Sequence, residues 1–272
     1  MQLIRKYSRQ RGVTFVEVMV GLSVGVIVIG GAISVYSSSV QSSNNTLRTS
    51  RLNQEMAGLM LVMTNDIRRA GYWQNTTASD LPLNPFSQSD ATALLVRDDM
   101  VSDTAQPPTG QGNCITYAYD ATYLAGNTPG VVDNTDLFGF RLDGGVVQMR
   151  QSGTVDGTAC VGGTCNSCGN GTWSNVTDEN LIEVTALNFD LSNSECLNAS
   201  EPNLVDDNAD GVIDDDAEVD CYATVPTAGS GDVTAESREV RITVTARLAN
   251  DITTQATATQ TVTVRNDVIR IR

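Results

Sequence analysis

The chain has 272 residues, of which 40% are hydrophobic and 18% are charged, and its formal net charge is -15. The apolar content is sufficient for a folded core, and the acidic balance makes nucleic acid a poor partner because both molecules would be negatively charged. Histidine is absent, which excludes Ser-His-Asp and Cys-His catalysis and His-ligated zinc or iron.

The N-terminal region combines a basic flank with a long apolar run. Residues 1–12 contain four basic side chains, and the 24 residues from 13 to 36 are almost all apolar or small. At about 1.5 Å per helical residue, such a run crosses a hydrocarbon core about 30 Å thick. The basic flank should remain in the cytoplasm, so we predict a membrane-spanning helix at 13–36 and an exported remainder.

Glu17 interrupts the apolar run. A carboxylate within a membrane helix is costly and indicates a function and a partner. Cleavage between Gly12 and Val13 would create an amine that, on the same or a neighbouring subunit, could pair with Glu17 at low dielectric. Neither of two alternatives, a secretory signal cut near the serines at 37–39 or a plain signal anchor, explains a glutamate at this position.

Residues 11–17, Arg-Gly-Val-Thr-Phe-Val-Glu, resemble the cleavage motif of type IV prepilins. The shared features are the basic leader, the glycine before the cut and a glutamate at the fifth mature position. Val13 departs from the family pattern, which usually has Phe or Met there. The resemblance implies that a prepilin peptidase removes the leader, residues 1–12, and methylates the Val13 amine, and that Glu17 serves subunit assembly.

The helix should continue well beyond the membrane. One helical face carries apolar residues at spacings of four, three, four and four, namely Leu52, Met56, Leu59, Met63 and Ile67. No proline precedes Pro82, so we expect a helix from about 14 to about 70, roughly 85 Å long, that stops at Gly71. Its amphipathic half, 37–73, should pack on the exported domain. The run 66–73, Asp-Ile-Arg-Arg-Ala-Gly-Tyr-Trp, resembles the minor pilin family PilW.

Residues 74–272 are predicted to form a β-rich globular head. Strands are expected at 92–97, 114–119, 181–191, 240–248 and 256–264, and a hairpin is expected around Asp143-Gly144-Gly145. The clearest strand is 240–248, which alternates apolar and polar residues over nine positions. The segment 263–266, Thr-Val-Arg-Asn, resembles the closing strand of pilins. We therefore expect an α+β, type IV pilin-like fold with the long helix on an antiparallel sheet.

All six cysteines lie in the C-terminal two thirds, which fits disulfides in an exported domain: Cys114, Cys160, Cys165, Cys168, Cys196 and Cys221. Six cysteines allow 15 pairings. The preferred pair is 196 with 221, because these residues bracket one loop. That choice suggests 114 with 160 and 165 with 168, stapling a Gly-, Ser- and Asn-rich loop at 152–180. A cytosolic zinc site and a redox Cys-x-x-Cys are the alternatives, and the export signal and the lack of a thioredoxin-like pattern disfavour them.

An acidic stretch at 206–214 resembles the start of a calcium loop. Oxygen ligands at positions one, three, five, seven and nine, with glycine at six, would come from Asp206, Asn208, Asp210, Val212 and Asp214. Ala217 stands where an EF-hand has glutamate, and Asp215, Asp216 or Glu218 could substitute. The alternative is an acidic, solvated loop, which would crowd like charges without a cation. We expect a structural calcium ion.

Together these features predict a minor pilin of a type IV pilus rather than an enzyme. It would act in pilus priming or biogenesis, and so in adhesion, twitching motility or DNA uptake. Expected partners are other pilins, the prepilin peptidase, the inner-membrane assembly machinery and a tip adhesin. The protein would sit in the inner membrane with a periplasmic head before entering the pilus. Alternatives are a type II secretion pseudopilin and a membrane-tethered periplasmic enzyme or glycan-binding module.

Overall fold

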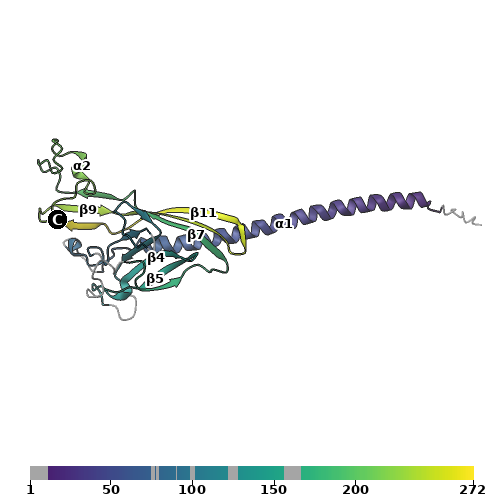
Figure 1. Cartoon of the computed structure of the whole chain (residues 1–272), viewed down its shortest axis with the longest axis horizontal. Helices are drawn as coiled ribbons and strands as arrows, with labels where there is room; N and C mark the ends of the chain where they lie inside the picture. Colours follow the sequence, from purple (N-terminus) through teal and green to yellow (C-terminus); the bar gives the residue numbers. More distant parts are fainter. Residues whose placement is uncertain are drawn as a thin grey trace, which may run out of the picture. The chain divides into compact units, whose positions relative to one another are not determined.

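The structure is a computed structural model, and it describes residues 12–74, 77, 80–89, 91–98, 102–121, 128–155 and 167–272. The chain divides into two units, Met1–Ser50 and Arg51–Arg272. Helix α1 (Phe15–Ile67) begins in the first unit and ends in the second (Figure 1). The second unit contains every strand that the structure describes and is called the head below.

In the first unit, the part of α1 up to Ser50 exposes nearly all its side chains. Large apolar side chains such as Phe15, Leu22 and Ile27 are exposed by 78%, 67% and 73%. The most apolar stretch of the helix has a mean hydropathy of 2.4 and is long enough to cross a membrane, and none of it is buried within the protein. These properties agree with the predicted membrane half at 13–36.

In the head, α1 buries the predicted apolar stripe. Leu52, Met56, Leu59, Met63 and Ile67 are each at most 4% exposed, as the helical spacing predicted. The α-helix ends at Ile67, a few residues before the expected end, because residues 68–71 form turns. The turn ends at Gly71, whose φ of +72° lies in the left-handed region that glycine tolerates best.

The larger of the sheets has five antiparallel strands. They are β1 (Leu95–Arg97), β3 (Cys114–Ala118), β4 (Leu137–Asp143), β5 (Val146–Ser152) and β6 (Thr172–Asn175), in that spatial order. Strands β4 and β5 form the hairpin expected from the Asp-Gly-Gly sequence. Gly144 and Gly145 form its two-residue turn, with φ values of +57° and +85°, and a type I′ turn requires positive φ at both positions.

A four-stranded antiparallel sheet has the order β11-β10-β7-β2. Its strands are β11 (Asp251–Thr263), β10 (Glu239–Leu248), β7 (Ile182–Asp190) and β2 (Gln111–Gly112). The predicted alternation in β10 is confirmed, because Val240, Ile242, Val244 and Ala246 are fully buried. Strand β11 pairs with β10 as predicted and is five residues longer at its start than expected.

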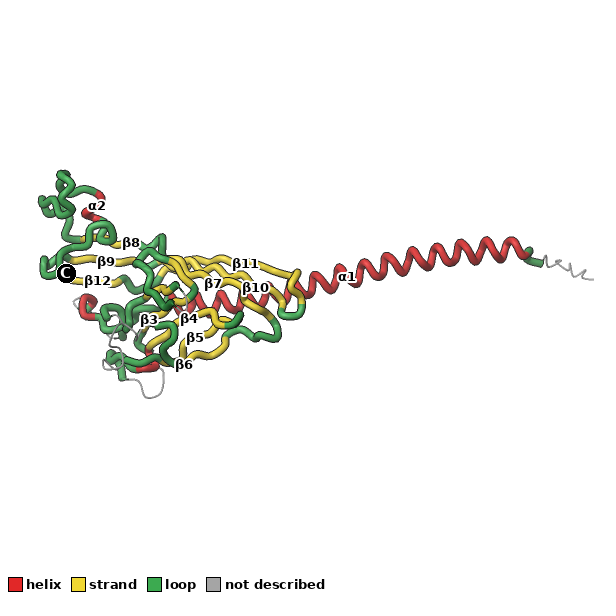
Figure 2. The backbone as a smooth tube through the Cα atoms, in the orientation of Figure 1, coloured by secondary structure: helices red, strands yellow, loops and turns green. Residues whose placement is uncertain are grey.

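A third sheet, which the sequence did not predict, has the order β12-β9-β8. It contains β12 (Val268–Ile271), β9 (Val233–Ser237) and β8 (Glu195–Asn198). A loop with the short helix α2 (Asp216–Val219) lies beside β8 (Figure 2). Two single-turn 3₁₀ helices, η1 (Leu81–Leu83) and η2 (Asn134–Asp136), complete the described elements.

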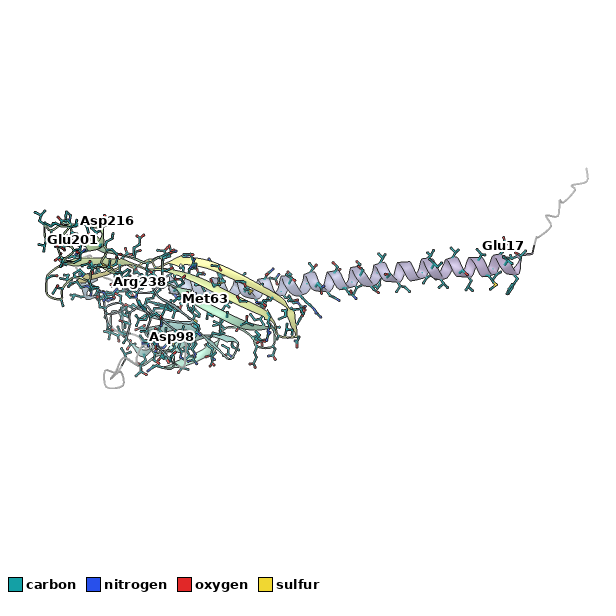
Figure 3. The ribbon with its side chains drawn as sticks, turned by 45° about the horizontal axis from the view of Figure 1, so that its top comes forward. Glu17, Met63, Asp98, Glu201, Asp216 and Arg238 are labelled. Atoms are coloured by element: carbon teal, nitrogen blue, oxygen red, sulfur yellow. A yellow bond between two sulfur atoms is a disulfide. The ribbon has the colours of Figure 1, made fainter. Side chains whose placement is uncertain are left out.

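One hydrophobic cluster joins α1 to the two larger sheets. It contains the α1 stripe together with side chains from β1, β3, β4, β5, β7, β10 and β11. Met63 is fully buried among them and lies over the strands in Figure 3. The fold is therefore α+β, with the end of a long helix packed on antiparallel sheets, as predicted.

Candidate functional site

The processing segment lies immediately before the helix. Gly12, Val13 and Thr14 form a short exposed segment that leads into α1 at Phe15. The basic leader falls at residues 1–11, outside the described residues. The peptide bond predicted to be cut, between Gly12 and Val13, thus lies just before the first helical position and outside any regular element.

Glu17 makes local hydrogen bonds in the first turn of α1. Its carboxylate oxygen Oε2 accepts from the Thr14 N–H and from the Thr14 hydroxyl, both at 3.4 Å. The Glu17 N–H donates to Thr14 Oγ1, also at 3.4 Å. This is the reciprocal pattern of a capping box, which satisfies donors that the first helical turn leaves without partners. The box was not predicted, although Thr-x-x-Glu is its signature.

The predicted Asp-x-Arg-x-Ala-Gly-Tyr run contains a buried acid that ties α1 to β3. Asp66 is 8% exposed and accepts hydrogen bonds from Tyr117 Oη at 2.5 Å and from Tyr119 Oη at 2.8 Å. Arg69 lies one turn further along, 3.9 Å from the Asp66 carboxylate and over the Tyr119 ring. Burial raises the pKa of Asp66, and the two tyrosine hydroxyls and Arg69 oppose that rise.

The same run is held by the segment that follows β11. Asn266 donates its side-chain N–H to the carbonyl of Ala70 at 2.9 Å. Asn84 does the same for the carbonyl of Gly71 at 2.8 Å, and the Gly71 N–H donates to the Ala118 carbonyl at 2.8 Å. The two pilin-like motifs, at 66–73 and 263–266, therefore meet at the end of the helix and satisfy backbone groups that a helix end leaves open.

Two disulfides lie in the described part of the head. Cys196 pairs with Cys221, as predicted. Cys114 pairs with Cys168, so the predicted pairs 114 with 160 and 165 with 168 were wrong. The prediction failed because β3 runs beside β4, which carries Arg141, and the Arg141 guanidinium holds the Cys168 carbonyl at 2.5 Å. Cys160 and Cys165 lie outside the described residues.

The Cys196–Cys221 disulfide closes the acidic loop that was predicted to bind calcium. Asp206 accepts from the N–H groups of Asp210 and Gly211, at 3.1 and 2.9 Å, and Asn208 Oδ1 accepts from the Asp210 N–H at 2.9 Å. Asp214 Oδ1 instead accepts from the backbone of residues 203 and 204. The side-chain oxygens of this loop are thus held by its own backbone.

Three carboxylates converge beside this loop. Glu201, Asp214 and Glu218 each place an oxygen within 4.8 Å of the others. Glu218 is only 1% exposed, and both its oxygens accept backbone N–H groups, including that of Asp207 at 2.5 Å. Figure 3 shows Glu201 and Asp216 together at this end of the head. Of the five predicted ligands only Asp214 belongs to the cluster, and calcium binding stays a prediction.

Comparison with protein families gives two matches. Residues 45–264 match the family described as prepilin peptidase-dependent protein B. Residues 7–33 match the prokaryotic N-terminal methylation motif, which includes Gly12, Val13 and Glu17. The first match covers most of the chain, and the second lies over the segment where cleavage was predicted.

A curated relative also matches part of the chain. It is the pilin-like protein PilA3 of Thermus thermophilus, which is 34% identical over 86 residues. The match covers 30% of this chain and 37% of the relative, so it spans little more than a third of that protein. No solved structure matches the chain.

Proposed function

The chain belongs to the family of prepilin peptidase-dependent protein B, and from this premise we propose that it is a minor pilin that helps to prime or build a type IV pilus. The observation that carries the proposal is a single carboxylate, Glu17, the fifth residue after the processing point Gly12–Val13, on an exposed helix of membrane-spanning length. The role is structural rather than catalytic.

Processing would give Glu17 a charged partner on a neighbouring subunit. In the unprocessed chain its carboxylate caps the helix start through Thr14. Cleavage after Gly12 leaves a charged amine at Val13, and the amine of an adjacent subunit would attract the Glu17 carboxylate more strongly than a neutral hydroxyl does. A carboxylate at low dielectric is costly without such a partner, so the pair would favour one register between packed helices.

The partners follow from this role. The prepilin peptidase would process the chain, and the inner-membrane machinery would extract it. Other pilins would pack on the apolar part of α1, and the head would face further minor pilins or a tip adhesin. The pilus would then serve adhesion, twitching motility or DNA uptake, with the chain held in the inner membrane, its head in the periplasm, before assembly.

Mass spectrometry of the protein from its native membrane tests the processing step. We expect an N-terminus at Val13 with one added methyl group. Glu17→Ala should leave the head folded and abolish incorporation into pili, whereas the control Glu55→Ala, on an exposed part of the same helix, should assemble normally. An N-terminus beyond residue 36, or normal piliation with Glu17→Ala, would reject the proposal.

The nearest alternative is a pseudopilin of a type II secretion system, which would share the processed helix. The pilin-like name of the Thermus relative favours the pilus. Co-purification of the native protein with pilus components, rather than with secretion components, is the expected result. Loss of secretion with intact pili in a deletion strain would support the alternative.

We also propose that the acidic loop binds a structural calcium ion. The donor set fits a hard cation, because Glu201, Asp214 and Glu218 bring three carboxylates within 4.8 Å. A bound Ca²⁺ would offset their mutual repulsion and stiffen the loop that Cys196 and Cys221 close.

Melting of the mature protein in detergent micelles, with calcium or with chelator, tests this proposal. Calcium at about 100 times its Kd should add about 2.7 kcal/mol of stability to the folded state. The variants Asp214→Asn and Glu218→Gln should lose the calcium shift, whereas Glu179→Gln, at an exposed site outside the cluster, should keep it. An unchanged melting temperature at millimolar calcium would exclude the ion.

A further inference from the structure

Strand β11 forms the outer edge of the four-stranded sheet (Figure 1). It is 13 residues long, whereas β1 and β6, at the edges of the five-stranded sheet, have three and four. Among the residues that the structure describes, β10 is the only strand paired with it. An edge strand of this length carries a row of backbone N–H and C=O groups without strand partners.

The register shows which residues direct these groups outward. The Val264 N–H donates to the Arg238 carbonyl at 2.9 Å, which makes this a hydrogen-bonded pair of the antiparallel ladder. Hydrogen-bonded and non-hydrogen-bonded pairs alternate along an antiparallel ladder. From residue 255 onward, the backbone N–H and C=O groups of the even-numbered residues therefore bond to β10, and those of the odd-numbered residues point away from it. The hydroxyls of Thr245 and Thr257 lie 3.0 Å apart, as expected where side chains of a non-hydrogen-bonded pair approach closely.

From residue 255 to 263, where β11 pairs regularly with β10, the edge lacks charge and proline, two of the usual protective features; the register shift lies nearer the start of the strand. No charged residue and no proline occurs from 252 to 264, although 18% of the whole chain is charged. Thr257, Thr259 and Thr261 are all exposed. Natural edge strands are normally blunted by charge, proline, a bulge or a covering segment. The edge of β8, by contrast, is covered by the chain near Asp220, which pairs with Leu197.

We infer that the outer edge of β11 receives an extended strand from a neighbouring subunit in the assembled pilus. This inference rests on the proposed function. Only another extended backbone matches the alternating N–H and C=O groups of a sheet edge, and an uncharged partner segment would avoid burying an unpaired charge.

The partner strand must differ from β11 itself. Subunits of a polar filament point the same way and meet through two different surfaces. Pairing β11 with β11 would instead require a two-fold axis, and the contact would close after two copies. A different edge, carried by another minor pilin, therefore supplies the strand.

Proline substitution at the outward-facing positions tests the inference. The Thr257 N–H points away from β10, so Thr257→Pro leaves the inner ladder intact and removes one outward donor. The matched control Thr257→Ala keeps that donor. We expect both proteins to be processed at Val13, and the proline variant to enter pili at least tenfold less than wild type, with Thr259→Pro behaving alike. Wild-type assembly of both proline variants, with Glu17→Ala still blocked, would overturn the edge inference alone.

Hydrogen exchange provides a second readout that does not depend on the folding of a variant. In the mature protein in micelles, the amides of 257, 259 and 261 should exchange quickly, whereas those of 256, 258 and 260 should be protected. In assembled pili the odd-numbered amides should slow at least tenfold. Unchanged exchange there would overturn the inference. Protection that grows with concentration in the purified protein alone would also overturn it, because the partner would then be a second copy.

Discussion

Loss of one hydroxyl from the buried Asp66 cluster should destabilise the head substantially. Tyr117 is 1% exposed, and its Oη donates to Asp66 Oδ2 at 2.5 Å. Tyr117→Phe keeps the ring and removes the donor. A buried hydrogen bond to a charged group contributes about 1.5–3 kcal/mol, and the Asp66 side chain that would lose it is only 11% exposed. We therefore expect a loss of about 2 kcal/mol in the free energy of unfolding.

Thermal unfolding of the mature protein in micelles, followed by circular dichroism, measures this loss. For a folded body of about 200 residues, 2 kcal/mol corresponds to a fall of about 4–8 °C in Tm. Tyr72→Phe is the matched control, because Tyr72 is 45% exposed and should shift Tm by less than about 1 °C. A change below about 0.5 kcal/mol for Tyr117→Phe would show that Asp66 does not depend on this donor, and would refute the argument.

Three further predictions follow from the head. Burial raises the pKa of Asp66 above its unfolded value. The free energy of unfolding of wild type, measured relative to Asp66→Asn, should therefore be greatest below pH 3.8 and should fall as the pH rises through the folded pKa. A flat difference in unfolding free energy across pH 3–7 would contradict this. Replacing Cys196 and Cys221 by serine opens a loop with a sequence separation of 25 and should cost about 3–4 kcal/mol in denaturant titrations, and an unchanged midpoint would refute it. Gly112→Ala should reduce soluble yield and lower Tm by more than about 5 °C, because its Cβ would lie 1.9 Å from the Arg97 carbonyl oxygen; a wild-type melting curve would reject that packing.

The strand most readily predicted from the sequence, β10, has a long and regular alternation of apolar and polar residues. Strand β10 alternates over nine positions and sits between two neighbours, so the same periodicity that marked it in the sequence also buried it. Strands β8, β9 and β12 have four or five residues each. Their identity comes from mutual pairing across more than 30 residues of chain, and that pairing leaves little trace in local composition.

The candidate sites also divide into residues with a local sequence signal and residues that distant parts of the chain bring together. Glu17 stands out in the sequence because an acid in an apolar run is unusual, and its role between subunits stays a prediction. Its hydrogen-bond partner Thr14 was missed, although the Thr-x-x-Glu spacing could have revealed it. The pairing of Cys114 with Cys168 was not predictable, since it depends on which loop returns over β3. Glu218 joins the carboxylate cluster from α2, one position beyond the EF-hand spacing, so a count along the chain from Asp206 could not fix its role.

The position of β10 in the sheet determines the order in which parts of the head can fold. This strand lies in the interior of its sheet, between β7 and β11, and shares the core with a helix face some 180 residues earlier in the chain. Contacts of such long range make folding slow, on the order of milliseconds to seconds for domains rich in non-local pairing. The methionine-rich face of α1 is therefore synthesised well before the strands that bury it. Degradation or aggregation would compete with folding at that stage, before assembly begins.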